Sequence, residues 1–281
     1  MLHTIQGFLP GFAVDVFRLC VWLTLLTAIF VPLERWAGLR QAGAVRREVH
    51  TNLVYYFLNS LLPALLLAAP LALVAVTAQR VLPPALPAMF AGLPLAVRLL
   101  LALVIGEIGF YWGHRLSHQI PWLWRFHAVH HSAEHMYFLV NTRAHPVDMM
   151  ITRLFGLAPL YALGLAGPSA AGTATPVFVI LAGTFWSFLI HADIRWRCRP
   201  IEWLVSTPVF HHWHHSRVDH INRNYASMLP VLDRVFGTHY LPGHWPDAYG
   251  IEEAHPATLR GQLVGPLRGS LRRQAPEQGV K

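Results

Sequence analysis

Histidines are the residues of this 281-residue chain whose type and spacing could do chemistry. Twelve of the eighteen histidines lie between His114 and His215. Most of these twelve form three histidine boxes, His114-x3-His118, His127-x2-His130-His131 and His211-His212-x-His214-His215. Residues four apart in a helix project from the same face, so the outer pair of each box can reach one site. This spacing predicts a metal centre bound by histidines.

The type of ligand narrows the choice of metal. A structural zinc site normally recruits thiolates, but Cys20 and Cys198 are the only cysteines and lie far apart. A haem would use only one or two histidines. Eight or more neutral imidazoles suit two first-row transition ions with open coordination positions. We favour two irons able to bind and reduce O2, and zinc, manganese and copper remain compatible with the same ligands.

A simpler interpretation makes these histidines ordinary hydrogen-bonding residues of a core or a membrane surface. That interpretation suits any single histidine. It does not suit three boxes, because clustered imidazoles without a cation would repel one another when protonated and leave buried nitrogens unpaired.

Composition predicts an integral membrane protein. Hydrophobic residues make up 54% of the chain, charged residues only 13%, and the mean hydropathy is +0.39, whereas about a quarter of residues are charged in typical soluble domains. The formal net charge of +8 comes from arginine, since Lys281 is the only lysine. This positive charge fits cytoplasmic loops and contact with lipid head groups. Nucleic-acid binding is not predicted, because the sequence has no basic stripe interleaved with aromatic residues.

Apolar stretches predict the membrane helices. They cover residues 11–33, 51–79, 99–113 and 154–190. We expect the first to stay as a helix and not to be cleaved as a signal peptide. The third runs into the first box, so one helix should carry His114 and His118. The fourth is broken by glycine and proline, which predicts a helical hairpin or a re-entrant pair.

Between the second and third stretches, residues 81–94 contain four prolines and predict a turn or an interfacial loop. An arginine-rich loop at residues 34–50 and all three boxes should then share the cytoplasmic face. We therefore predict an all-α integral membrane protein, a bundle of about four transmembrane helices with a cytosolic histidine-rich helical cap. Its expected parts are a transmembrane region at 1–113, a di-metal catalytic region at 114–240 including the hairpin, and a polar C-terminal tail at 241–281.

The boxes and their flanking residues resemble the fatty acid hydroxylase and sterol desaturase superfamily. Tyr111-Trp112 precede the first box, and Asn224-Tyr225 and Leu232-Asp-Arg-Val-Phe-Gly-Thr238 follow the last. The similarity covers roughly residues 105–240, with Leu232 standing where members usually have Trp. The resemblance implies a membrane-bound, non-haem di-iron oxygenase that uses O2 as co-substrate.

The resemblance also implies that single histidines complete the site. The predicted ligands are then His114, His118, His127, His130, His131, His145, His191, His211, His214 and His215. His135 and His212 are predicted to be non-ligands. Carboxylates that could orient ligating imidazoles are Asp148, Asp193, Asp219 and Glu134. Glu107 could hydrogen-bond a ligand, or simply pair with Arg98 or Arg115.

The reaction implied by the resemblance is hydroxylation, or desaturation, of an unactivated C–H bond in a membrane lipid such as a fatty acyl chain or a sterol. The sequence holds no dinucleotide, flavin or iron–sulfur motif and no cytochrome segment, so we expect an external ferredoxin, cytochrome or reductase to supply electrons. The alternatives are a non-catalytic relative and a metal transporter. The transporter is disfavoured because residues 51–79 and 154–190 hold no histidine or carboxylate.

Overall fold

The described part of the chain is helical. The computed structural model describes residues 11–38, 45–166, 174–197, 199–217, 220–252 and 255–268. Within these ranges there is no β-strand, only an isolated antiparallel bridge between Ser216 and Tyr249. The all-α prediction is confirmed for this part of the chain.

Three of the described helices are long and apolar enough to cross a membrane. They are α2 (Gly11–Ala37), α3 (Val45–Val81) and α5 (Leu95–Gln119). These helices contain the first three apolar stretches, and α3 continues through both of its prolines. The proline-rich segment after α3 includes one short helix, α4 (Ala85–Ala91).

The fourth apolar stretch forms shorter helices. Helix α7 (Pro146–Ala162) begins before this stretch, and α8 (Ala174–His191) completes it. The predicted turn of the hairpin falls partly on residues 167–173, which lie outside the described residues. The described chain therefore has three candidate spans and an apolar pair of shorter helices, where we predicted about four spans.

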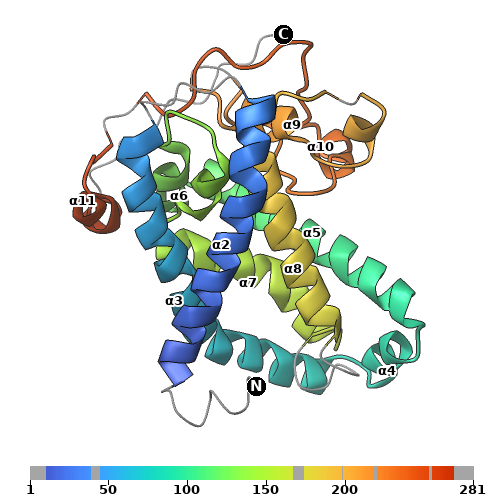
Figure 1. The fold of residues 1–281 in the computed structure, drawn as a ribbon. Coiled ribbons are helices and arrows are strands. Elements are labelled where there is room, and N and C mark those ends of the chain that lie inside the picture. The colour runs from blue at the N-terminus through green and yellow to red at the C-terminus, as the bar shows by residue number, and fades with distance from the viewer. Residues whose placement is uncertain are drawn as a thin grey trace.

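The histidine boxes lie on three helices. Helix α5 runs without interruption from its apolar part into the first box, as predicted, and α6 (Pro121–His131) and α9 (Pro208–His214) carry the other two. Both α6 and α9 start with a proline. Proline suits the first helical turn because it lacks the N–H group that would have no intrahelical partner there. Figure 1 shows α6, α9 and α10 (Val231–Val235) at one end of the helical stem, with α4 at the other.

The end of the stem that carries α6, α9 and α10 is called the cap. Helix α2 is connected to the cap by one buried carboxylate and an aromatic cluster. Glu34 accepts hydrogen bonds from the backbone N–H groups of Phe138 (2.7 Å) and Asp193 (3.2 Å). Phe30, one turn earlier, stacks on Phe138 with ring centroids 5.5 Å apart. The carboxylate thus joins α2 to the segments that follow α6 and α8.

Glycines let α5 and α7 approach closely. A Cβ added at Gly109 of α5 would collide with the backbone carbonyl oxygen of Phe155 on α7, and one at Gly113 would lie 2.7 Å from the Phe155 Cβ. At Gly106 the nearest atom would be 3.6 Å away, which is ordinary contact. Because α5 carries His114 and His118, this contact sets the position of the first box.

We therefore predict that Gly109→Ala is destabilising whereas Gly106→Ala is tolerated. Overpacking against a backbone atom that cannot rotate away should cost about 1–3 kcal/mol. Thermal unfolding of the detergent-purified variants, followed by the helical circular dichroism signal, measures the difference. Equal losses in the two variants would contradict the proposed close contact.

Candidate metal centre

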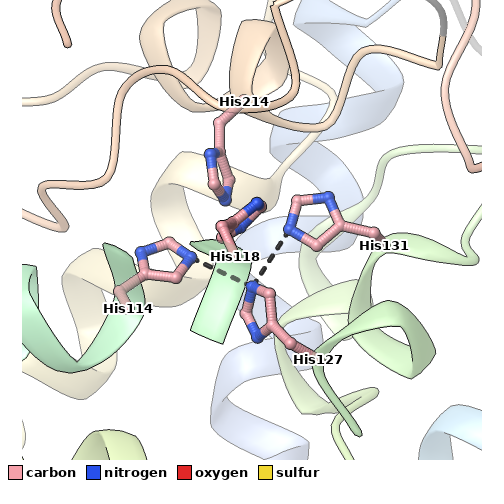
Figure 2. Close-up of side chains that lie close together, drawn as sticks. All are labelled: His114, His118, His127, His131 and His214. Atoms are coloured by element: carbon pink, nitrogen blue, oxygen red, sulfur yellow. Dashed lines mark hydrogen bonds between the residues drawn. The ribbon is translucent and has the colours of Figure 1, made fainter. Parts of the chain in front are cut away.

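Nine of the ten predicted ligands come together in two groups. Figure 2 shows the first group, with five rings directed at one centre: His114, His118, His127, His131 and His214. The second group is His130, His191, His211 and His215. One ring nitrogen from each member lies within 4.8 Å of those of the other members, and all nine side chains are buried.

The second and third boxes each serve both groups. His127 and His131, four apart on α6, belong to the first group, while His130 faces the second. The third box does the reverse, because His211 and His215 belong to the second group and His214 to the first. This division follows from the helical period, which turns adjacent residues about 100° apart.

The inner nitrogens are spaced as ligands of a shared ion would be. The His127 Nε2 atom lies 3.1 Å from the Nε2 atoms of both His114 and His131 (Figure 2). In the second group the His191 Nε2 lies 3.2 Å from that of His130 and 3.0 Å from that of His211. Such separations suit nitrogens that are each about 2.0–2.1 Å from one metal ion.

Outer hydrogen bonds fix where the protons lie in the first group. The His114 Nδ1 is 2.7 Å from the Tyr225 carbonyl oxygen, and the His214 Nδ1 is 2.7 Å from the Arg223 carbonyl oxygen. A carbonyl only accepts, so each Nδ1 must donate and each neutral ring presents an unprotonated Nε2 to the centre. The buried His214 Nε2 has no hydrogen-bond partner among the described residues.

The second group shows the same pattern more sharply. The His130 Nδ1 donates to the Arg143 carbonyl (2.9 Å) and the His191 Nδ1 to the Ser187 carbonyl (2.6 Å). Their two Nε2 atoms, 3.2 Å apart, are then both acceptors with no proton between them. Facing lone pairs in a buried site repel unless a cation lies between them, so the residues present fit a metal in each group.

Burial keeps these rings in the neutral form that binds metal. Desolvation, with a further contribution from neighbouring imidazoles, lowers the pKa of His130 to about 4. The same causes lower the pKa of His131, His214 and His215 well below the ordinary histidine value. No proton has to be displaced from these nitrogens at neutral pH before a metal binds.

One of the candidate carboxylates contacts a grouped histidine. The Asp148 Oδ2 lies 3.0 Å from the His127 Nδ1, and both side chains are buried. Burial raises the pKa of Asp148, but the imidazoles of His127, His130 and His114 together outweigh this, and the net pKa is lowered. A carboxylate in this place fixes the ring orientation and raises the basicity of the ligating nitrogen.

The other candidate carboxylates have different partners. Asp193 pairs with Arg195 (3.4 Å), Glu134 is exposed, and Asp219 lies outside the described residues. Glu107 accepts from the backbone N–H groups of Met228 (2.5 Å) and Leu229 (3.2 Å). Glu107 therefore positions the segment after the third box and has no recorded contact with a grouped histidine.

The structure does not bring His145 to either group. His145 is the N-cap of α7, and its Nδ1 accepts from the Val147 N–H (3.1 Å). Its Nε2 lies 3.0 Å from the Leu263 carbonyl on α11 (Leu259–Val264). With both ring nitrogens engaged elsewhere, His145 has a helix-capping position in place of the predicted ligand position.

His135 and His212, which the sequence predicts to be non-ligands, also lie outside both groups. The His212 Nε2 is 3.1 Å from the Ala192 carbonyl oxygen, and its Nδ1 is 3.0 Å from the Tyr249 hydroxyl. His212 thus links α9 to the end of α8 and to the C-terminal segment.

A short strap that the sequence did not predict holds two of the grouped histidines. It comprises residues 223–225, whose carbonyls accept from His214 and His114. Asp233 anchors it by accepting from the backbone N–H groups of Tyr225 (2.8 Å) and Ala226 (2.9 Å). Asn224 adopts a left-handed φ of 57° and donates to the Phe210 carbonyl on α9 (2.8 Å). The motif that carries the family resemblance includes Asn224, Tyr225 and Asp233. The sequence did not indicate that these residues hold two of the histidines in place.

An apolar cavity of about 640 Å³ opens on both groups of histidines. Its lining includes His114 and His127 from the first group and His130 and His191 from the second. Its walls come from α3, α5, α7 and α8 and include Leu67, Leu71, Leu103, Phe110, Leu157, Leu160 and Phe188. The cavity therefore joins a site suited to metal with a space suited to an apolar molecule.

Residues 99–238, which contain both groups, match the model of the fatty acid hydroxylase family. The chain belongs to the fatty acid hydroxylase family. The matched range agrees closely with the extent of the resemblance in the sequence.

Three curated relatives of this chain are named as hydroxylases or monooxygenases. An ornithine lipid hydroxylase of Rhizobium tropici is 37% identical over 53% of this chain and 44% of its own length. An alkylglycerol monooxygenase of Xenopus tropicalis is 30% identical over 53% of this chain and 31% of its own. A methylsterol monooxygenase of Arabidopsis thaliana is 26% identical over 51% of this chain and 52% of its own. The chain thus spans about half or less of the length of each relative. No solved structure matches it.

The first prediction from this geometry is that Asp148→Asn weakens metal binding. The amide keeps the shape and can still accept a hydrogen bond, but loses the charge that makes His127 a better ligand. Loss of such a supporting carboxylate typically costs about 10–100-fold in metal affinity. The metal retained during dialysis against a chelator, measured by mass spectrometry, checks this. The matched control is Asp247→Asn, an exposed aspartate of the cap that should behave as the wild type.

The second prediction concerns the pH stability of the metal-free protein. Because burial depresses the pKa of His130 to about 4 from the ordinary 6.5, the folded state binds fewer protons than the unfolded state between these values. The free energy of unfolding therefore has its full value above pH 6.5. It falls as the pH is lowered toward 4, by up to about 1.4 kcal/mol per pH unit for each such histidine. Thermal unfolding of chelator-treated protein should show a steep loss, and a flat profile would contradict neutral buried rings.

Proposed function

We propose that this chain is an O2-dependent hydroxylase of a membrane lipid, with one iron ion in each histidine group. The observation that carries the proposal is that ring nitrogens of nine buried histidines gather in two groups, and that members of both groups line one apolar cavity. The ligand atoms alone suit several first-row ions. Family membership supports iron among them.

The bound irons would supply the activation of O2 and the removal of hydrogen from an unactivated C–H bond. The protein groups hold and orient them: His127 is aimed by the Asp148 carboxylate, and His114 by the Tyr225 carbonyl. Apolar side chains around the histidines keep bulk water from the reacting centre. No proton-transferring residue beyond the ligand set is assigned.

The proposed substrate is a lipid with a long apolar part. The ornithine lipid, alkylglycerol and methylsterol in the names of the relatives share that property. The cavity walls suit it, because they are built mainly from aliphatic and aromatic side chains of the stem helices. Hydroxylation is preferred to desaturation because these three relatives are named hydroxylases or monooxygenases.

We also propose that the histidine-rich cap faces the cytoplasm. The stretch of residues 34–50, which includes the end of α2 and the start of α3, carries Arg35, Arg40, Arg46 and Arg47. Arginine-rich segments next to spans favour the cytoplasmic side. An external ferredoxin, cytochrome or reductase would deliver electrons to this face.

The proposal predicts that His131→Ala loses iron and product together. His131 is fully buried and faces both His127 and His215, so its removal should open the site and reduce product formation by at least about 100-fold. The experiment expresses wild type and variant with a competent reductase, then compares cellular lipids and the metal content of the purified proteins.

The control for this experiment is His135→Ala, which removes a histidine outside both groups and should leave iron and product unchanged. An unchanged lipid profile in cells that express wild type, together with absence of iron in the purified protein, would refute the hydroxylase proposal.

A further inference from the structure

Arg153 is a cation in the wall of the apolar cavity. It lies on α7, and the cavity-lining residues of this helix follow its period: Asp148, Met149, Thr152, Arg153, Gly156, Leu157, Leu160 and Tyr161. Arg153 thus shares a stripe with Asp148, the carboxylate that contacts His127. Five residues of helix separate the two positions by about 7.5 Å along the axis.

No protein group described by the structure neutralises Arg153. Among the described residues no ion pair or hydrogen bond reaches its guanidinium, and it is the one arginine or lysine among those that line the cavity. The cavity also has two carboxylates, but Asp148 is bound to His127 and Glu107 to the backbone N–H groups of Met228 and Leu229. The Arg153 side chain itself remains exposed and therefore reachable by a ligand.

The guanidinium would lose water when an amphiphile fills the cavity, and a charge that loses water needs a partner. Its planar fork of donors matches the oxygens of a carboxylate or a phosphate and can bind them through two parallel hydrogen bonds. The rest of the cavity wall is mainly apolar and would hold a hydrocarbon chain. Together these features describe a site for an amphiphile whose head group is anionic.

We propose that Arg153 binds a carboxylate or phosphate head group of the lipid substrate inside the cavity. This inference rests on the proposed function, since it names the class of lipid that the same site would take. It makes Arg153 a specificity-determining residue, and it separates anionic lipids from neutral alcohols and sterols as substrates. Because Arg153 and Asp148 share one wall of α7, the head group would be held on the helix that also orients His127.

Equilibrium binding tests this without requiring turnover. The purified full chain, in nanodiscs of a neutral lipid, is titrated with radiolabelled dodecanoate, dodecyl phosphate and dodecylglycerol, with empty nanodiscs giving the background. Wild type should bind at least one of the two anions about tenfold more tightly than dodecylglycerol, the change expected for one charge-assisted contact. The stronger of the two anions identifies the head group.

Variants locate the effect. Arg153→Gln should abolish the preference for the anion and leave dodecylglycerol binding unchanged, whereas Arg153→Lys should keep part of it. The matched control is Arg18→Gln on α2, which removes an exposed arginine that pairs with Asp15 and does not line the cavity. Equal unfolding temperatures for the arginine variants exclude a general loss of fold.

Two outcomes would overturn the inference. One is equal binding of anionic and neutral amphiphiles by wild type. The other is equal loss of anion binding in Arg153→Gln and Arg18→Gln, which would reflect charge attraction at the membrane surface. Either result leaves the hydroxylase proposal standing, since that proposal depends on iron and product formation. Conversely, intact anion binding without product would refute only the reaction.

Discussion

The structure depends on nine buried imidazoles that must be neutral and must present lone pairs toward two centres. Burial alone disfavours such a cluster, because each imidazole has two nitrogens that need hydrogen-bond partners and little water is nearby to supply them. The outer nitrogens of four rings are satisfied by main-chain carbonyls, those of Tyr225, Arg223, Arg143 and Ser187. These carbonyls fix the tautomer, so the cluster is organised for a cation before any cation is bound.

This requirement explains features of the cap that otherwise have no evident use. The strap at residues 223–225 must hold two carbonyls at fixed positions, so it is pinned from one side by Asp233 and from the other by Asn224. Asn224 tolerates its left-handed backbone because its short side chain hydrogen-bonds nearby main chain. Tyr111 of α5 is linked to the strap through Thr238. Its hydroxyl lies 2.8 Å from the Thr238 hydroxyl, and the Thr238 carbonyl accepts from the Asn224 N–H (2.9 Å). Residues well separated in sequence are thereby tied to the position of His114.

The sequence contains the parts of this site that depend on local periodicity. His127 and His131 share one face, and His130 another, because a helix turns by a fixed angle per residue. The grouping of the outer pairs could therefore be predicted, as could the continuous helix that carries His114 and His118. The main-chain carbonyls could not, since every residue has one and only the tertiary fold aims it. The break in the fourth apolar stretch was visible in its glycine and proline, and α7 and α8 lie on either side of it.

His145 shows why a family pattern does not settle a role. It stands directly before Pro146, and proline favours the first position of a helix, so His145 occupies the N-cap. An N-cap side chain is drawn to the free N–H groups of the first turn, and here the Nδ1 accepts one of them. That contact fixes the start of α7, and α7 carries Asp148 to His127 and Arg153 to the cavity. A histidine that is not grouped with the metal-facing rings thus still sets where two polar residues of the cavity lie.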